Sequence, residues 1–138
     1  MQTVLTREEL NTFLEDHFQQ VVGLMHVEHV GNAELTLRGR TIPDHLRPGG
    51  TVSGPAMFAL ADVGIYLNIL SIIGLKALSV TTNASIDFMR KPVPDRDLIA
   101  NCRVLKIGKS LAVGDALIYS EGQESPVARS SMTYSIPK

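Results

Sequence analysis

The feature that most constrains the fold is a long apolar segment, residues 51–75, which holds a single charged residue, Asp62. Ser53 is a good helix N-cap and Gly74 is a plausible C-terminal stop, so the sequence predicts one helix over residues 53–74. Apolar side chains surround nearly the whole circumference of this helix, and other parts of the chain must therefore cover it. We expect a central helix wrapped by the rest of the protein.

A membrane-spanning helix is the alternative for this segment, because it is long enough to cross a bilayer. Asp62, followed by Asn68 and Ser71, would be costly in hydrocarbon, which favours burial in a protein core. The N-terminal residues 1–9 lack the basic stretch and apolar run of a secretory signal. The single cysteine, Cys102, cannot form an internal disulfide, so the sequence indicates a cytoplasmic protein.

The remaining sequence predicts one more helix and a sheet. Thr6 and Glu9 have the spacing of a capping box and precede apolar residues at helical intervals, so an amphipathic helix is expected within residues 1–20. Gly31-Asn32 separates two alternating runs and predicts a two-residue hairpin turn. The strands expected from alternation are residues 27–30, 33–38, 80–88, 98–107, 111–120 and 127–136.

These elements predict a single α+β domain over residues 1–138, in which an antiparallel β-sheet curls around the long central α-helix. Such an open sheet has edges, so we expect association through an edge strand or the helix, giving at least a dimer. The formal net charge of -1 and the aromatic content of 5%, without tryptophan, argue against nucleic acid as a partner.

Asp62 is the strongest candidate for chemistry. A carboxylate on an apolar helix costs stability unless it is paired, solvated in a cleft or used in a reaction. The structural alternatives are a cap for a neighbouring loop or an ion pair with an arginine such as Arg47 or Arg90. The four histidines have no acidic or cysteine partner at metal-ligand spacing, so no metal is expected.

The N-terminus of the central helix is the second candidate. Its first N–H groups, those of Gly54 and Ala56 especially, lack helical acceptors and can hold an oxyanion, although Ser53 can equally act as an ordinary cap. Gly54 and Asp62 lie about 12 Å apart along a helix axis, so one small carbonyl cannot contact both. Two copies that pair their helices antiparallel about a two-fold axis would bring Gly54 of one to Asp62 of the other.

The strand after the helix contributes polar side chains. Alternation places Thr81 and Asn83 on one face with Ser85 and Asp87, so the Thr81 hydroxyl can reach a water near Asp62. Threonine is also common in strands for its conformational preference alone, which is the alternative explanation for Thr81.

Two segments resemble the hotdog-fold acyl-CoA thioesterases of the PaaI-like family, and the resemblance covers roughly residues 21–137 in element order. Leu60-Ala61-Asp62 matches the family's Leu-Ala-Asp segment. Phe88-Met89-Arg90-Lys91-Pro92 matches its Phe-x-Arg-Pro-like stretch with one extra residue. Ser53-Gly54-Pro55 stands where the family usually has a His-Gly-Gly turn.

The resemblance implies a hotdog fold and hydrolysis of acyl-CoA thioesters with small or medium acyl or aryl groups, without metal or redox cofactor. Asp62 would attack the thioester or activate water, the Gly54 N–H would polarise the carbonyl, and Thr81 would position the water. An apolar slot lined by Met57, Phe58 and Ile65 would hold the acyl group. The residues expected to bind substrate are Ser53, Pro55, Met57, Phe58, Asn83, Arg90 and Lys91, of which the last two would contact the coenzyme A phosphates.

Two alternatives remain from the sequence. The missing His-Gly-Gly turn favours a catalytically silent protein that binds acyl-CoA. The other alternative is a dehydratase or hydratase that acts on acyl thioesters. The chain resembles that class in having a histidine before the helix and an acid on it, and His45 and Asp62 would be that pair. Their separation of 17 residues, which follows from their numbers, exceeds the spacing of about 14 that this resemblance implies.

Overall fold

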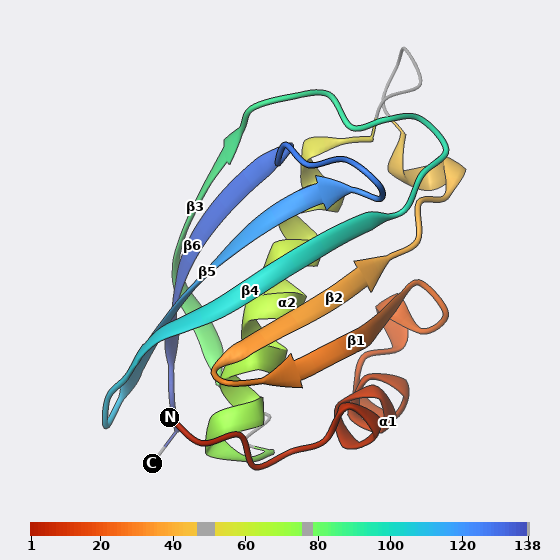
Figure 1. Ribbon diagram of the computed structural model, residues 1–138. Coiled ribbons are helices and arrows are strands. Elements are labelled where there is room, and N and C mark those ends of the chain that lie inside the picture. Colours follow the sequence, from red (N-terminus) through yellow and green to blue (C-terminus); the bar gives the residue numbers. More distant parts are fainter. Residues whose placement is uncertain (47–51, 76–78, 138) are drawn as a thin grey trace.

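The computed structural model describes residues 1–46, 52–75 and 79–137. Figure 1 shows an antiparallel sheet that curves around one long helix, α2, while the shorter α1 lies beside the first strand. The order of the six strands is β1-β2-β4-β5-β6-β3. The elements are α1 (Arg7–His17), η1 (Gln19–Val21), β1 (Met25–Gly31), β2 (Glu34–Gly39), η2 (Pro43–His45), α2 (Gly54–Ile73), β3 (Val80–Phe88), β4 (Leu98–Ile107), β5 (Leu111–Ser120) and β6 (Ala128–Ser135).

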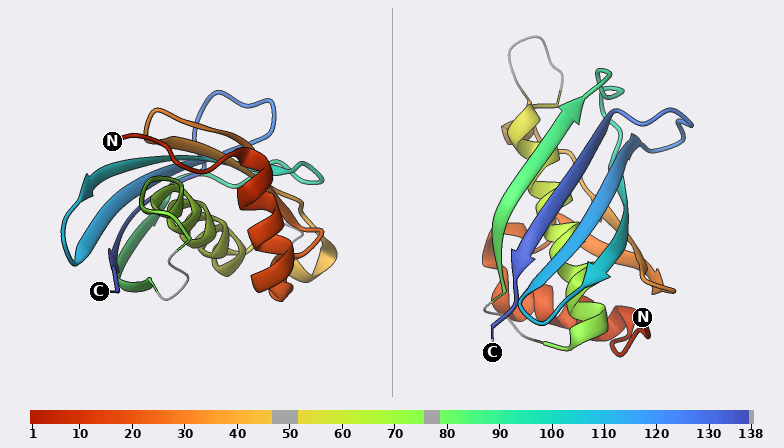
Figure 2. Two further views of the ribbon diagram at one scale, coloured as in Figure 1. Left: turned by 90° about the horizontal axis from the view of Figure 1, so that it is seen from below. Right: turned by 90° about the vertical axis from the view of Figure 1, so that its left-hand side faces the viewer.

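The central helix is confirmed with its predicted caps. The Ser53 side chain accepts a hydrogen bond from the Ala56 N–H at 3.3 Å, and Gly74 ends the helix with a φ of 92°. Although α2 is long and apolar enough to span a membrane, 67% of its most hydrophobic window is buried inside the domain. Figure 2 shows the reason, since the sheet curls over the helix. We conclude that α2 is the core helix of an α+β domain.

The first helix is shorter than the sequence suggests. The capping box between Thr6 and Glu9 is present, but α1 covers only Arg7–His17. Phe18 leaves helical geometry with a φ of -125°, and the short η1 that follows places Val21 in the core. The apolar residues at helical spacing therefore extend beyond the helix itself.

The hairpin between β1 and β2 turns one residue later than predicted. Gly31 pairs with Glu34, so the two turn residues are Asn32 and Ala33, with φ values of 55° and 62°. This left-handed backbone is unfavourable for alanine, but the Ala33 carbonyl accepts hydrogen bonds from the Val104 N–H and from Nδ2 of the buried Asn68. Contacts with β4 and α2 thus stabilise a turn that the backbone preference of Ala33 alone would not favour.

The two edges of the sheet differ in their protection. The β1 edge is covered by α1, whose Asn11 side chain accepts a hydrogen bond from the Val27 N–H at 2.7 Å and donates one to its carbonyl at 3.1 Å. The β3 edge has no such cover from the described part of the chain (Figure 2). Within the single chain β3 covers little of α2: Val80 is 57% and Phe88 52% exposed, and only Ile86 is partly buried.

Candidate active site

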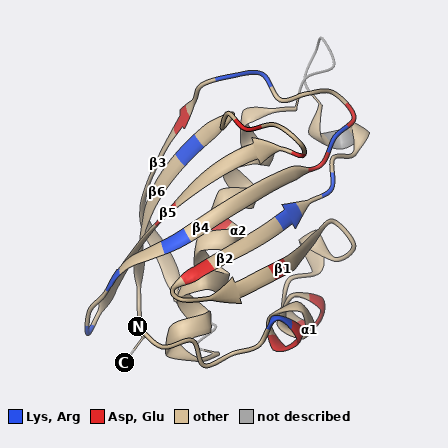
Figure 3. Ribbon diagram, viewed as in Figure 1, with Lys and Arg blue, Asp and Glu red and all other residues tan. Residues whose placement is uncertain are grey.

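Asp62 is half-buried and is the only charged residue of α2, which is otherwise tan in Figure 3. Its hydrogen bonds place it on the side of the helix that faces β3 and β6. Its Oδ1 accepts a hydrogen bond from the Thr81 hydroxyl at 2.9 Å and another from the Tyr134 hydroxyl at 2.5 Å. No ion pair among the residues that the structure describes includes Asp62. Arg90 instead donates to the Pro126 carbonyl at 2.7 Å, and Arg47 lies outside the described residues.

A β-bulge in β3 decides which side chains can reach Asp62. Thr81 pairs with Tyr134, but Asn83 pairs with Thr133, so one extra residue lies between the two pairs. Directly opposed residues share a face of the sheet, and the buried Tyr134 marks the face toward α2. Thr81 therefore faces Asp62, whereas Asn83 faces away from it. The prediction that Thr81 and Asn83 share one face is wrong, because strict alternation does not hold across a bulge.

Tyr134 is a site residue that sequence reasoning missed. Its side chain is only 1% exposed, and a buried tyrosine hydroxyl nearly always finds a hydrogen-bond partner. Burial, together with the negative charge of Asp62, raises the pKa of Tyr134 and keeps its hydroxyl protonated. The alternation of β6 placed Tyr134 on the inward face with Met132, which was the available signal, but it could not show which helix residue the hydroxyl meets.

The two predicted oxyanion donors at the N-terminus of α2 differ in the hydrogen bonds that the described residues provide. The Ala56 N–H donates to the Ser53 side chain, so it is already satisfied. Among the hydrogen bonds of the described residues, none uses the Gly54 N–H. A Cβ on residue 54 would lie 3.1 Å from Cζ of Phe88, so the glycine allows the end of β3 to pack against the helix start.

A first cavity, of about 470 Å³, is lined by Gly54; we call it the Gly54 cavity. It is lined by Val52, Gly54, Met57, Phe88, Met89, Arg90, Lys91 and Pro92. Arg90 and Lys91 are both exposed, so their charges lie at solvent-accessible positions near the helix N-terminus. The structure thus brings both predicted phosphate-binding residues to the cavity that Gly54, the predicted oxyanion donor, lines.

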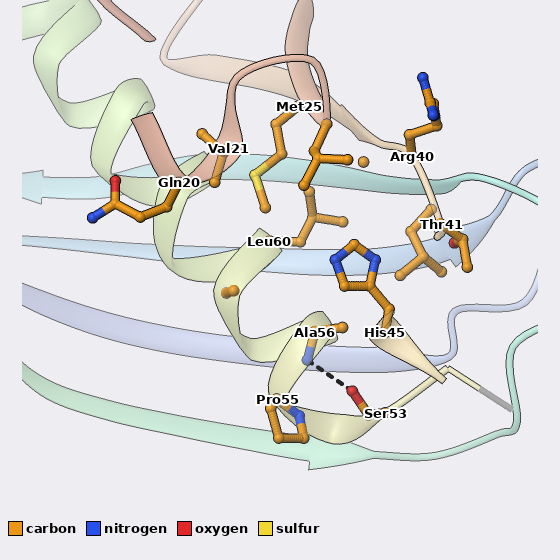
Figure 4. Close-up of a pocket in the computed structure, with 14 residues that line it drawn as sticks. Gln20, Val21, Met25, Arg40, Thr41, His45, Ser53, Pro55, Ala56 and Leu60 are labelled. Carbon is orange, nitrogen blue, oxygen red and sulfur yellow. Dashed lines mark hydrogen bonds between the residues drawn. The ribbon is translucent and has the colours of Figure 1, made fainter. Parts of the chain in front are cut away.

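A second cavity, of about 340 Å³, lies on another side of the helix start; we call it the His45 cavity (Figure 4). The α2 residues Pro55, Ala56, Ala59 and Leu60 form one wall with the N-cap Ser53, and mostly apolar residues of η1, β1, β2 and β4 close it. Nδ1 of His45 accepts a hydrogen bond from the Ile42 N–H at 3.3 Å, so the neutral imidazole carries its proton on Nε2.

The slot predicted from Met57, Phe58 and Ile65 is not formed within one chain. Met57 lines the Gly54 cavity, Phe58 is 37% exposed on the surface, and Ile65 is fully buried in the core. His45 and Asp62 also lie on different sides of α2, because Asp62 bonds to β3 and β6 while the His45 cavity borders β1 and β2. Within the described ranges, no three His, Cys, Asp or Glu side chains cluster as metal ligands do.

Comparisons with known proteins agree with this fold. The Thioesterase superfamily model matches residues 49–127. A crystal structure of a candidate thioesterase from Silicibacter sp. TM1040 superposes with a TM-score of 0.93 at 54% identity, covering 100% of this chain and 96% of that one. A search of curated proteins gives no match.

Two more distant structures support the fold alone. Zebra fish thioesterase superfamily member 2 has a TM-score of 0.86 at 18% identity, covering 97% of this chain and 100% of that one. A mutant of the phenylacetic acid degradation protein PaaI from Thermus thermophilus has a TM-score of 0.72 at 23% identity, covering 91% and 99%. A six-stranded antiparallel sheet around one central helix is the hotdog fold. The chain belongs to the thioesterase superfamily, and its membership supports thioester hydrolysis in general terms.

Proposed function

We propose that the protein hydrolyses acyl-CoA thioesters with small or medium acyl or aryl groups to the free acid and coenzyme A. The observation that carries the proposal is the Asp62 carboxylate, which two hydroxyl groups hold at a half-buried position on an otherwise apolar helix. In a chain of the thioesterase superfamily, such a carboxylate is suited to act as nucleophile or base.

Besides Asp62, the reaction needs a hydrogen-bond donor that polarises the thioester carbonyl, and the Gly54 N–H is the best candidate. Either the carboxylate adds to the thioester carbonyl or it takes a proton from a water that adds. In both cases the carbonyl oxygen becomes an oxyanion, which a free backbone N–H at a helix N-terminus stabilises. The C–S bond then breaks, and coenzyme A leaves as a thiolate that takes up a proton. In the nucleophilic route, water hydrolyses the resulting anhydride at Asp62.

A second copy of the chain completes this site in our proposal. Gly54 and Asp62 of one helix are about 12 Å apart along its axis, so they cannot act on the same carbonyl. The described part of the chain leaves the β3 edge uncovered, and α2 exposes Phe58 next to Asp62, beside Pro55 and Ala59, which border the His45 cavity. Exposed apolar surface beside an open strand edge is typical of an interface between subunits. A homodimer, alone or within a dimer of dimers, would have two equivalent sites.

The two cavities at the start of α2 suggest where each part of the substrate binds. Arg90 and Lys91 in the Gly54 cavity would contact the coenzyme A phosphates, and the mostly apolar His45 cavity would take the acyl group. This placement replaces the slot of Met57, Phe58 and Ile65. A cytoplasmic location fits the free, buried Cys102, since no disulfide supports the fold.

Thiol release from a panel of acyl- and aryl-CoA thioesters tests the proposal, with wild type compared to Asp62→Asn at matched fold and oligomeric state. The asparagine amide oxygen can still accept both hydroxyl hydrogen bonds, so the variant is expected to fold normally and to lose roughly 10³-fold or more in kcat. Release that does not depend on Asp62 would contradict the assigned role.

A catalytically silent acyl-CoA-binding protein is the second candidate, favoured by Ser53-Gly54-Pro55 in place of the usual His-Gly-Gly turn. Tight binding of acyl-CoA without release across the panel would establish it. The dehydratase alternative is weaker, because His45 and Asp62 lie on different sides of α2 within one chain.

A further inference from the structure

We propose that Tyr134 is a positioning residue for the reaction: together with Thr81 it fixes the Asp62 carboxylate through Oδ1, so that Oδ2 is the oxygen that acts on the thioester or on water. This inference rests on the proposed function, because it specifies which atom of Asp62 reacts and what holds that atom in place.

The two hydroxyl groups share one acceptor. Tyr134 lies 2.5 Å and Thr81 2.9 Å from the same oxygen, Oδ1 of Asp62. The Tyr134 hydroxyl is also 2.8 Å from the Asp62 backbone carbonyl, but it has a single proton to donate. A hydrogen bond to a charged oxygen is shorter and stronger than one to a neutral oxygen, so the proton points to Oδ1.

The other carboxylate oxygen is left available. No hydrogen bond from the described residues reaches Oδ2 of Asp62. Because a carboxylate is planar and rigid, fixing Oδ1 and the side-chain stem also fixes the direction in which Oδ2 points. An unpaired oxygen in a fixed direction is pre-organised for attack and loses little freedom in the transition state.

Tyr134 itself is not placed to touch the substrate. Its side chain is 1% exposed, its ring centroid lies 6.2 Å from that of Tyr66, and its hydroxyl is 3.5 Å from Sδ of Met132. These contacts close off the hydroxyl on the sides away from Asp62. Tyr134 therefore acts through Asp62, which distinguishes a positioning residue from a catalytic one.

The first test detects the hydrogen bond without depending on activity. The Tyr134 hydroxyl proton is expected to give a downfield, slowly exchanging proton NMR signal, because the bond is short and buried. The signal should disappear in Tyr134→Phe, move upfield in Asp62→Asn and remain in Tyr119→Phe, a hydroxyl-deletion control on β5. A signal that is unaffected by Asp62→Asn would overturn the proposal.

The second test measures the consequence for catalysis. In Tyr134→Phe, kcat for the best thioester should fall about tenfold while KM stays within about twofold, since binding groups are untouched. Addition of Thr81→Val should lower kcat by more than the product of the two single effects, because either hydroxyl alone still restrains Oδ1. A kcat equal to that of Tyr119→Phe would overturn the role of Tyr134. Failure of the proposed function would differ, since wild type itself would then release no thiol.

Discussion

Thr81 and Tyr134 are directly opposed residues of β3 and β6, and both of their hydroxyl groups donate to Oδ1 of Asp62. One residue belongs to the uncovered edge strand and the other to the interior of the sheet. The carboxylate of α2 is therefore bonded to the edge of the sheet at which we place the second subunit. Packing between copies and orientation of Asp62 are expected to be coupled through Thr81.

Removal of the Thr81 hydroxyl tests its part of this arrangement. Thr81→Val has nearly the same shape but cannot donate, so kcat is expected to fall about tenfold, the equivalent of one hydrogen bond to a charged group. Thr81→Ser retains the donor and should keep most of the wild-type activity. Initial rates of thiol release at saturating substrate distinguish the two variants. A loss in Thr81→Ser as large as that in Thr81→Val would contradict this role, because the retained hydroxyl would then fail to preserve activity.

The oxyanion role of the Gly54 N–H can be tested with proline. Gly54→Pro removes the N–H at a helix position where proline is tolerated, and loss of one oxyanion donor typically costs about 10²–10³-fold in kcat. Gly54→Ala is the matched control, because it adds a Cβ near Phe88 but keeps the N–H. We expect the proline variant to be the far slower of the two in the thiol-release assay. Similar rates would show that this N–H does not bind the oxyanion.

Helix α2 packs so closely on β4 that a Cβ on residue 64 would lie 2.6 Å from Sγ of Cys102. Gly64→Ala is therefore expected to destabilise the protein by about 1–3 kcal/mol through overpacking. The double variant with Cys102→Ala, which removes the sulfur, should recover much of that loss. Urea unfolding of the four proteins in this cycle gives the coupling. Additive effects would contradict the close contact.

Arg38 joins three carboxylates from different segments, with distances of 2.9 Å to Glu28, 2.9 Å to Asp97 and 2.8 Å to Glu121. These hydrogen bonds raise the pKa of Arg38. A group whose pKa is raised on folding makes its full contribution to the free energy of unfolding at every pH below its pKa in the unfolded chain. Arg38→Met should thus cost about 1–3 kcal/mol in urea unfolding, by a similar amount at pH 7 and pH 9. Arg103→Met, which breaks one exposed pair with Asp115, should cost much less.

The sequence predicted the elements with strong local signals and missed what depends on distant contacts. The caps of α2 and the bounds of β4 and β5 agree with the structure, because caps and period-two alternation are encoded locally. The hairpin turn at Asn32 and Ala33 could not be predicted, since contacts from Asn68 and Val104 select it. Likewise, the β3 bulge and the contact between Tyr134 and Asp62 depend on the register between strands that are far apart in sequence.

The interface between copies can be tested on the exposed face of α2. Phe58 is 37% exposed one helical turn before Asp62, and Phe58→Asp would place a charge in the proposed interface. We expect this variant to remain folded but to shift toward monomer in sedimentation equilibrium, and to lose thiol release in parallel. Leu117→Asp is a matched control, since Leu117 is 40% exposed on β5, remote from the β3 edge. It should retain at least the dimer and its activity. A fully active monomer of Phe58→Asp would rule out a site shared between two copies, because all of the residues that the reaction needs would then come from one chain.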